Sequence, residues 1–573
     1  MHKLFDAEMQ LLHEEAQRFS DAYPGEARQL NLRSLKDRDP YVERLLEGMA
    51  FLTAQVKARI EDDLPEIAET FIRQNCPTLL QILPGAFIAQ FDAIGSFPEI
   101  HFFPKGTEIK SQVVGPDNIE CGFRTTSDFE YLPLKLVNVL THSNDIETTI
   151  IKLSFQIEKS VNLLKNPIKS IPFYIHANAD FSLTLYHALL TSVKTVSLKL
   201  NLNDVSINLG DQIAIQPCYL YLRDTLLPSL GKVFDGFNLL LDYFAFLEKF
   251  LFFKIENLEK INWPSNVSSF DVEILMQPQL HQSYHLTSKN LLLNCIPMVN
   301  LYKYVVEPIN VTQKKYEYPV IADVSSKEGI QIQSIDSVQG IQNSQYSYEY
   351  TPLYNFEHDE NHFRYFSIFQ RHVKGCFPQH YITLSGKNAL HSERLSCVAS
   401  VNNGYYPRDY FTEFTFNGKS QNVPKNLRVT NVTRPSSWLM SPHYKGYLWS
   451  FVSYLSLNID TLSDSVSLKK CLSMFDWSAR DDNLKKREAI QAVKVRTMNV
   501  IHQGALSRII LYHLTLDESG FLNLGDVFLF GKVLHHFLSI FISLNFSVKT
   551  IIQCYPSEEI FSFEPLVGLQ CPI

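Results

Sequence analysis

The sequence lacks the cysteine pattern of a disulfide-stabilised or zinc-binding protein. Its nine cysteines are odd in number, scattered along 573 residues, and never spaced as Cys-x-x-Cys. This usage indicates a reducing compartment. The N-terminal stretch "MHKLFDAEMQLLHEE" carries acidic residues where a signal peptide needs an apolar core. We therefore expect a soluble, cytoplasmic protein.

The chain also lacks a clean apolar run of about 20 residues, which a membrane-spanning helix requires. The two most apolar stretches are Phe237–Ile255 and Val527–Phe546. Charged side chains interrupt both of them, for example Asp242 in the first and Lys532 in the second. We expect both stretches to be buried core elements, and we expect no direct membrane insertion.

A basic excess is missing too, because the formal net charge is −8. A nucleic-acid-binding protein usually shows a basic excess or a clear basic face. The densest basic run, Asn483–Arg496, directly follows the acidic pair Asp481 and Asp482, so its local charge is mixed. We interpret this run as a solvated helix or linker rather than a phosphate-binding stripe, and we expect no nucleic-acid partner.

Signatures of catalysis are absent as well, including the Gly-x-Ser-x-Gly elbow and the Gly-x-Gly-x-x-Gly fingerprint. The segment "HDENH" places His358 and His362 four residues apart, but a zincin helix needs Glu where this chain has Asp359. Two imidazoles alone leave a metal short of ligands, so a solvated polar segment is favoured. A metal-dependent hydrolase using His358 and His362 is the alternative. We expect no enzyme activity, cofactor or metal, and we expect His535 and His536 to be packed or hydrogen-bonded core histidines.

The segments that are present predict a multi-domain α+β fold. At roughly 100–200 residues per domain, this length should hold several domains. Long N-terminal helices are expected to precede β-rich mixed domains and a C-terminal α+β domain. The expected intervals are 1–75 (helical and bundle-forming), 76–160 (β-rich), 161–305 (α+β), 306–430 (β-rich) and 431–573 (C-terminal α+β).

The first two expected helices carry apolar stripes with nearly heptad spacing. The second helix begins at Pro40, with Asp39 as its cap, and extends to Leu64, about 37 Å at 1.5 Å per residue. The stripes can pack on each other within the chain or join a bundle with other chains, and the residues leave both possibilities open. The candidate partner-binding residues are Phe5, Met9, Leu12, Ala16, Phe19, Val42, Leu45, Met49, Leu52 and Val56.

Several long blocks resemble, in the same order, TssF, a baseplate component of type VI secretion systems that is also called VasA or ImpG. The first block is "DPYVERLLEGMAFLTAQVKARIEDDLPE", starting at Asp39. The segment around Arg487 also matches. The segment 341–392, which includes "HDENH", matches poorly, so the resemblance says little about its surface. The other blocks are "FPKGTEI", "CGFRTTSDFEYLPLKL", "FDGFNLLLDYFAFLEKFLFFKI", "NCIPMVNLYKYVVEPINVTQKKYEYPVI" and "FLNLGDVFLFGKVLHHFLSIFISLNFS".

The resemblance implies a structural role and brings no catalytic residue with it. TssF-like chains pair as two copies with one TssG to form a wedge, and wedges surround a spike hub of the VgrG type. TssK links the wedges to the membrane complex, and TssE links them to the contractile sheath. The chain is therefore expected in the cytoplasm, assembled at the inner face of the cell envelope.

The resemblance also favours a shared bundle over private packing for the N-terminal helices, with a second copy and a TssG-like partner contributing helices. A stand-alone binding module, such as an adhesin or a carbohydrate binder, is a further alternative. The cysteine usage and the missing export signal argue against that alternative.

Overall fold

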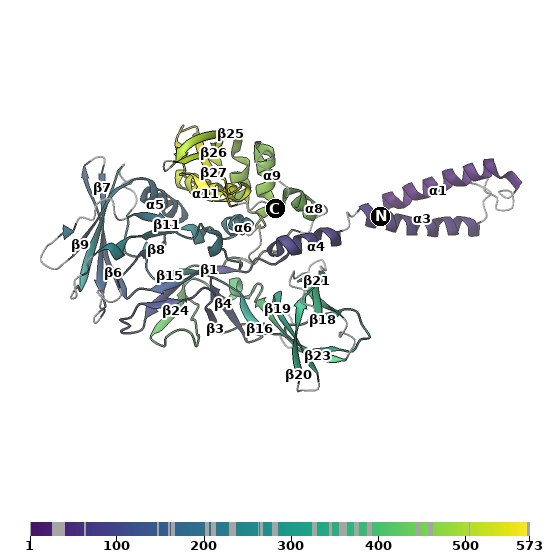
Figure 1. Ribbon diagram of the computed structural model, residues 1–573, viewed down its shortest axis with the longest axis horizontal. Helices are drawn as coiled ribbons and strands as arrows, with labels where there is room; N and C mark the ends of the chain where they lie inside the picture. The colour runs from purple at the N-terminus through teal and green to yellow at the C-terminus, as the bar shows by residue number, and fades with distance from the viewer. Residues whose placement is uncertain are drawn as a thin grey trace. The chain divides into compact units, whose positions relative to one another are not determined.

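The computed structural model (Figure 1) mixes helices with several β-sheets, which confirms the predicted multi-domain α+β class. The chain divides into two compact units, Met1–Gln74 with Pro442–Ser456, and Asn75–Ser441 with Leu457–Ile573. The structure describes residues 2–569 except 26–39, 62–64, 146–147, 159–160, 162–166, 201–205, 208–213, 229–235, 262, 264–266, 278–284, 324–328, 343–345, 354–363, 372–376, 387–391, 443–446, 456–461 and 503–504.

The first unit is helical. Its two longest helices, α1 and α3, lie side by side and antiparallel (Figure 1). Pro40 is the first residue of α3, where its missing N–H costs no hydrogen bond. A hydrogen bond between His13 Nε2 and Glu43 Oε1, 2.8 Å apart, joins the two helices. The helices are α1 (His2–Ala22), α3 (Pro40–Glu61), α4 (Pro65–Asn75) and α8 (Tyr447–Leu455).

The second unit is built around a five-stranded antiparallel sheet. Aromatic rings fill its core, with centroids of Phe87 and Phe123 at 4.5 Å and of Phe91 and Phe103 at 5.0 Å. In order, the strands are β24 (Leu427–Asn431), β1 (Ala86–Ala93), β15 (Cys295–Val299), β4 (Ile119–Thr125) and β3 (Glu108–Val114). Nearby elements are the strand pair β2 (His101–Phe103) and β5 (Phe129–Tyr131) and the short helix α7 (Tyr406–Tyr410).

Two further sheets of this unit are also antiparallel. In the first, Lys152 pairs with Asp271 at 2.9 Å and Lys199 pairs with Glu273 at 2.8 Å, so ion pairs link its neighbouring strands. Its strands are β10 (Ser206–Ile207), β9 (Val193–Leu200), β13 (Ser269–Met276), β7 (Thr148–Ile157) and β6 (Leu134–Asp145). The strands of the other are β11 (Ile215–Pro217), β12 (Phe252–Ile255), β8 (Ile171–Ile175) and β14 (Leu291–Leu292).

A β-rich lobe holds eight strands around an apolar core of its own. Glu393 is buried in this lobe, and the hydroxyls of Tyr348 and Tyr350 donate to its carboxylate. The strands are β16 (Tyr302–Val305), β17 (Ile309–Val311), β18 (Tyr318–Val320), β19 (Gln331–Gln342), β20 (Tyr346–Pro352), β21 (Tyr365–Arg371), β22 (Gln379–Ser385) and β23 (Glu393–Asn402).

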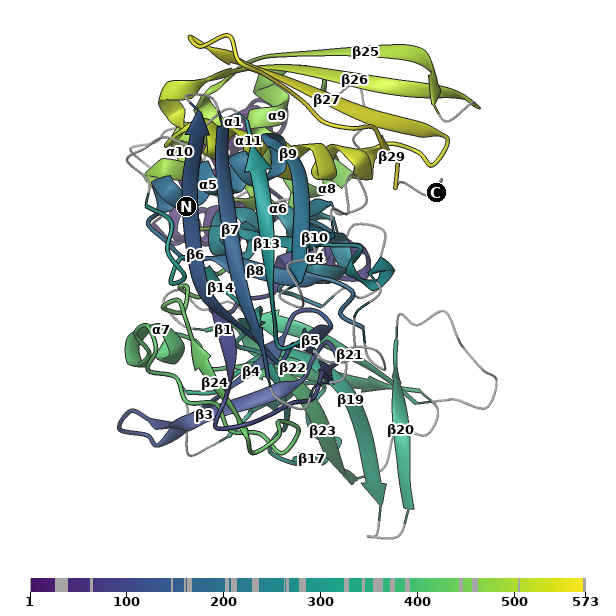
Figure 2. The same cartoon turned by 90° about the vertical axis from the view of Figure 1, so that its left-hand side faces the viewer.

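The C-terminal part places one face of a sheet on helices (Figure 2). β26 and β27 are parallel neighbours joined through helix α11, which packs on α5, α6 and β27. The strands are β25 (Ile490–His502), β26 (Ala505–Asp517), β27 (Phe546–Tyr555), β28 (Ile560–Ser562) and β29 (Leu566–Val567). The helices are α5 (Ala179–Thr191), α6 (Phe237–Ala245), α9 (Ser465–Phe475), α10 (Asp481–Glu488) and α11 (Leu524–Leu538).

Helix α11 is the core helix of this layer. The stretch Leu524–Phe541 is long and apolar enough to cross a membrane, but 83% of it is buried inside the protein. A Cβ atom on Gly525 would lie 2.2 Å from the carbonyl oxygen of Leu183, so α11 and α5 cross with their backbones in close contact. The second apolar stretch, Val527–Phe546, thus belongs to the core. The first, Phe237–Ile255, also does, because it contains the buried elements α6 and β12.

The central sheet draws its strands from distant parts of the chain. β1, β3 and β4 lie within 76–160, β15 lies within 161–305, and β24 crosses the expected boundary between 306–430 and 431–573. The intervals expected from the sequence therefore describe stretches of similar composition, and as domains they remain a prediction.

Candidate functional site

In the N-terminal helix hairpin, the buried residues of α3 lie along one side of that helix. Ala50 and Ala54 are 0% and 1% exposed, and Val42 and Leu46 are half-buried. These four residues follow one another at four-residue steps, which places them along one side of a helix with 3.6 residues per turn. The two alanines are short, so a neighbouring backbone can approach this side closely.

A second side of α3 presents large apolar residues to water. Tyr41, Leu45, Met49 and Leu52 are 81%, 73%, 59% and 62% exposed, and we call these four residues the α3 stripe. Their spacing of 4, 4 and 3 places them on one side of the helix, about 130° around the axis from the buried side. A row of this kind on a water-facing helix is typical of a protein–protein contact.

The ten candidate residues divide between these two environments. Leu45, Met49 and Leu52 belong to the exposed α3 stripe, and Phe19 of α1 is 40% exposed. The side chain of Val56 lies outside the described residues. The remaining five are half-buried, namely Phe5, Met9, Leu12, Ala16 and Val42.

The heptad pattern in the sequence therefore combined two sides of α3. Val42 lies on the buried side, whereas Leu45 lies on the exposed side, because three residues turn a helix by about 300°. The pattern also missed Tyr41, although it lies four residues before Leu45, and it missed Leu11 and Phe51, which are 52% and 50% exposed. Counting all large apolar residues at steps of three and four would have included Tyr41.

The described residues contain no group of three or more His, Cys, Asp or Glu side chains that could hold a metal ion. The candidate ligands of the alternative hypothesis, His358 and His362, lie outside the described part of the chain. None of the seven cysteines within the described part forms a disulfide.

His535 of α11 is a hydrogen-bonded core residue, as the sequence predicted. Its Nε2 lies 2.9 Å from the carbonyl oxygen of Glu564, which can only accept, so Nε2 carries the proton. Its Nδ1 then accepts from the hydroxyl of Thr550, also at 2.9 Å. Burial lowers the pKa of His535 to about 4, the Glu564 carbonyl opposes this, and the charge of Lys532 lowers the pKa further.

We expect His535 to make the protein less stable in acid. In the unfolded chain the imidazole is protonated below about pH 6.5, whereas in the folded chain it is protonated only below about pH 4. The free energy of unfolding therefore rises with pH between these two values. The His535 contribution lost at pH 5 is about 2 kcal/mol. Urea unfolding of the wild type and of His535→Gln at pH 7 and pH 5 measures it. An equal pH dependence in both proteins would contradict the assignment.

The basic run Asn483–Arg496 is not a solvated helix or linker, as the sequence suggested. Its first half lies in α10, where Lys486 is 8% exposed and its Nζ lies 2.6 Å from Asp526 Oδ1. Its second half belongs to strand β25. The sequence-based interpretation failed because the neutralising carboxylates lie outside the run, one of them 40 residues further along the chain.

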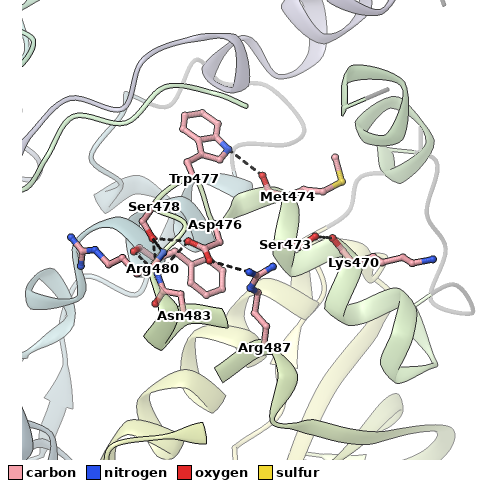
Figure 3. Close-up of polar contacts among 10 residues, drawn as sticks. Lys470, Ser473, Met474, Asp476, Trp477, Ser478, Arg480, Asn483 and Arg487 are labelled. Carbon is pink, nitrogen blue, oxygen red and sulfur yellow. Dashed lines mark hydrogen bonds and ion pairs between the residues drawn. The ribbon is translucent and has the colours of Figure 1, made fainter. Parts of the chain in front are cut away.

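A polar cluster fixes α10 to the end of α9 (Figure 3). From α10, Arg487 points to Asp476 Oδ2 at 3.4 Å, and Asn483 donates to Asp476 Oδ1 at 3.3 Å. Ser478 donates to Asp476 Oδ1 at 2.6 Å, and Asn483 also donates to the backbone carbonyl of Phe244 at 2.9 Å. The cluster holds three segments together directly before β25 begins, so it anchors the base of that strand.

Comparisons with known proteins agree with one another. The family described as "Type VI secretion system, TssF" matches residues 1–570. The type VI secretion system component TssF1 of Pseudomonas aeruginosa is 21% identical over an alignment of 614 positions, gaps included. The alignment covers 98% of each chain. A chain in the cryo-electron microscopy structure of a TssK-TssF-TssG baseplate subcomplex is 25% identical, with a TM-score of 0.77 over 92% of this chain and 100% of that chain. A chain in the type VI baseplate complex is 21% identical, with a TM-score of 0.62 over 100% of this chain and 99% of that chain.

Proposed function

The chain belongs to the TssF family of type VI secretion systems, and from this premise we propose that it is a non-enzymatic wedge subunit whose N-terminal hairpin binds partner helices. The membership confirms the resemblance that the sequence blocks indicated. TssF is a component of the type VI baseplate.

The proposed partners begin with a TssG-like subunit and a TssK-like adaptor. Both are supported by the 25% identical chain, which was solved within a TssK-TssF-TssG baseplate subcomplex. From the family resemblance we further propose a second copy of this chain beside one TssG-like subunit, a TssE-like sheath-linking subunit and a VgrG-like spike hub. Such an assembly would stand in the cytoplasm at the inner face of the cell envelope.

The observation that supports this function most directly is the exposure of the α3 stripe. Leu45, Met49 and Leu52 are 73%, 59% and 62% exposed, so their apolar surface is accessible to a partner. Fully burying one Leu or Met side chain contributes about 1.5–3 kcal/mol. A partner helix seated on the stripe would therefore gain enough to offset part of the cost of association.

The mass of the assembled complex tests the stoichiometry. We expect co-expression with the TssG-like subunit to raise the soluble yield and to give a complex with two copies of this chain, because obligate interfaces bury more than about 2,000 Å² of largely apolar surface. Native mass spectrometry or light scattering measures the copy number. A stable monomer that does not respond to the TssG-like subunit would count against the wedge role, and a one-to-one complex would contradict the pairing.

The alternative function, a metal-dependent hydrolase using His358 and His362, is tested separately. Metal analysis of the purified chain and of a double His→Ala variant at these positions decides between the two. Stoichiometric zinc that disappears in the variant, together with a hydrolytic activity, would support the hydrolase.

A further inference from the structure

The C-terminal sheet, whose outward face points away from the helices, has strands of unusual charge. β25, β26 and β27 together carry four Lys or Arg residues but a single acidic one, Asp517, which is the last residue of β26. The whole chain has a net charge of −8, so these strands contrast with the rest of the molecule. The four basic residues are Lys494, Arg496, Arg508 and Lys549.

Lys494 and Arg496 of β25 lie on this outward face. Their cross-strand neighbours are His513 and Leu511, and both basic side chains are exposed. In the described chain no carboxylate lies within ion-pair distance of either one. By contrast, Lys152 of β7 and Lys199 of β9 are each paired with an aspartate or glutamate. The positive charge on β25 is therefore available to another molecule.

The distal half of β25 extends beyond the helices that cover the sheet. Arg496, Thr497, Met498 and Asn499 are all exposed in succession, although neighbouring residues of a strand point to opposite faces. Both faces of this stretch are therefore free. Val493 and Val495, nearer the base, are half-buried.

The free side of β25 can accept another strand. β25 is the last strand of its sheet in the described chain, so about every second residue of this 13-residue strand, roughly 40 Å long, turns its backbone N–H and C=O groups toward the free edge. Only a polypeptide can pair with such an edge. Basic residues two apart on one face match acidic residues two apart on a neighbouring strand.

We propose that β25 binds an extended acidic segment of a partner protein, which adds as a strand to its free edge and places its carboxylates beside Lys494 and Arg496. The proposal rests on the proposed scaffold role, because an assembly subunit needs such contacts. It concerns a surface separate from the N-terminal hairpin. A lipid surface or a nucleic acid would use the charge but not the backbone edge.

Fluorescence anisotropy of a labelled eight-residue peptide with alternating Glu and Thr, mixed with the full chain, tests the proposal. We expect saturable binding that weakens at least tenfold in Lys494→Glu/Arg496→Glu and also weakens with added salt. The control Lys194→Glu/Lys425→Glu makes the same charge change at two exposed lysines elsewhere and should bind like the wild type. A peptide with Gln in place of Glu should bind at least tenfold more weakly.

Strand addition has its own test. In an extended peptide the N–H groups of alternate residues point to opposite edges, so the Glu and Thr positions form two separate rows of donors. One version of the acidic peptide is N-methylated at the Glu positions and the other at the Thr positions, and only loss of the row that faces β25 should weaken binding. One version should therefore bind and the other should not. Equal binding of both versions would overturn the proposal, and so would no binding of the parent peptide. In the second case the basic residues would only protect the free edge from unwanted strand pairing.

Phosphatidylglycerol vesicles and a DNA duplex form the remaining arms. Suppose that the wild type binds vesicles or DNA but not the peptide, and that this binding is lost in Lys494→Glu/Arg496→Glu. The ligand of β25 would then be a membrane or a nucleic acid, and the proposed acidic segment would be wrong. The assays contain no TssG-like subunit, so their failure leaves the wedge role intact. A failed co-purification with the TssG-like subunit would, in turn, leave a measured peptide affinity unchanged.

Discussion

Replacing Met49 by glutamate is expected to abolish co-purification with the TssG-like subunit while leaving the melting temperature of the isolated chain unchanged. Met49 is 59% exposed in the chain alone, so a charge at this position stays in water. In a bundle the same charge would be buried without a partner, which costs several kcal/mol. A loss of about 4 kcal/mol weakens binding roughly a thousandfold. Leu45→Glu should behave in the same way.

The matched control is Ala50→Glu, one residue further along the same helix. Ala50 is 0% exposed, so the glutamate would disrupt the hairpin itself and lower the melting temperature. Together the two variants separate binding from folding. A large loss of melting temperature in Met49→Glu would mean that the α3 stripe packs within the chain. Unchanged melting and unchanged co-purification would mean that the stripe faces neither a core nor a partner.

Replacing Lys249 by methionine is expected to destabilise the second unit by about 3–5 kcal/mol, the usual cost of leaving one partner of a buried ion pair alone. Lys249 Nζ lies 2.5 Å from Asp242 Oδ2, and the side chains are 0% and 1% exposed. The backbone N–H of Leu226 also donates to Oδ2, at 3.0 Å. Urea unfolding of the wild type and the variant measures the difference.

The pH dependence of this variant identifies the cause. Burial raises the pKa of the Asp242 carboxyl, and Lys249 opposes that rise. Without Lys249 the pKa rises further, so the folded variant binds a proton that the unfolded chain has released, and stability is lost as pH increases. The cost should therefore be smaller at pH 5 than at pH 8.

An exposed ion pair supplies the control for this prediction. Lys169 and Glu130 lie 4.0 Å apart with side chains 71% and 42% exposed, so Lys169→Met should cost less than about 1 kcal/mol. Similar losses in Lys169→Met and Lys249→Met would show that the loss of any lysine, rather than an unpaired buried carboxylate, explains the effect.

Local patterns in the sequence predicted the elements that local chemistry determines. Pro40 begins α3, as its missing N–H suggested, and Phe237–Ile255, which was expected to be buried in the core, contains the buried elements α6 and β12. His535 was expected to be a satisfied core histidine because its neighbours are apolar, and two hydrogen bonds satisfy it. In each case the decisive residues lie within a few positions of one another.

Features that depend on distant residues could not be predicted in this way. The burial of Lys486 depends on Asp526, and no local pattern links two residues 40 positions apart. The side of α3 that stays exposed depends on which side packs, and the apolar stripe alone could not distinguish Val42 from Leu45. The proposed contacts of β25 were likewise hidden, because strand order decides which strand lies at an edge.

The pairing of β1 with β24 determines which parts of this protein can fold first during synthesis on the ribosome. Ala89 pairs with Asn431, so the central sheet stays incomplete until more than 330 intervening residues have been made, roughly 20–70 s at the usual speed of synthesis. Helices α1 and α3 end at Ala22 and Glu61, and their contact with each other involves no later residue. A nascent chain can therefore display its α3 stripe long before the aromatic core of its central sheet has closed, and recruitment of a partner can begin during translation.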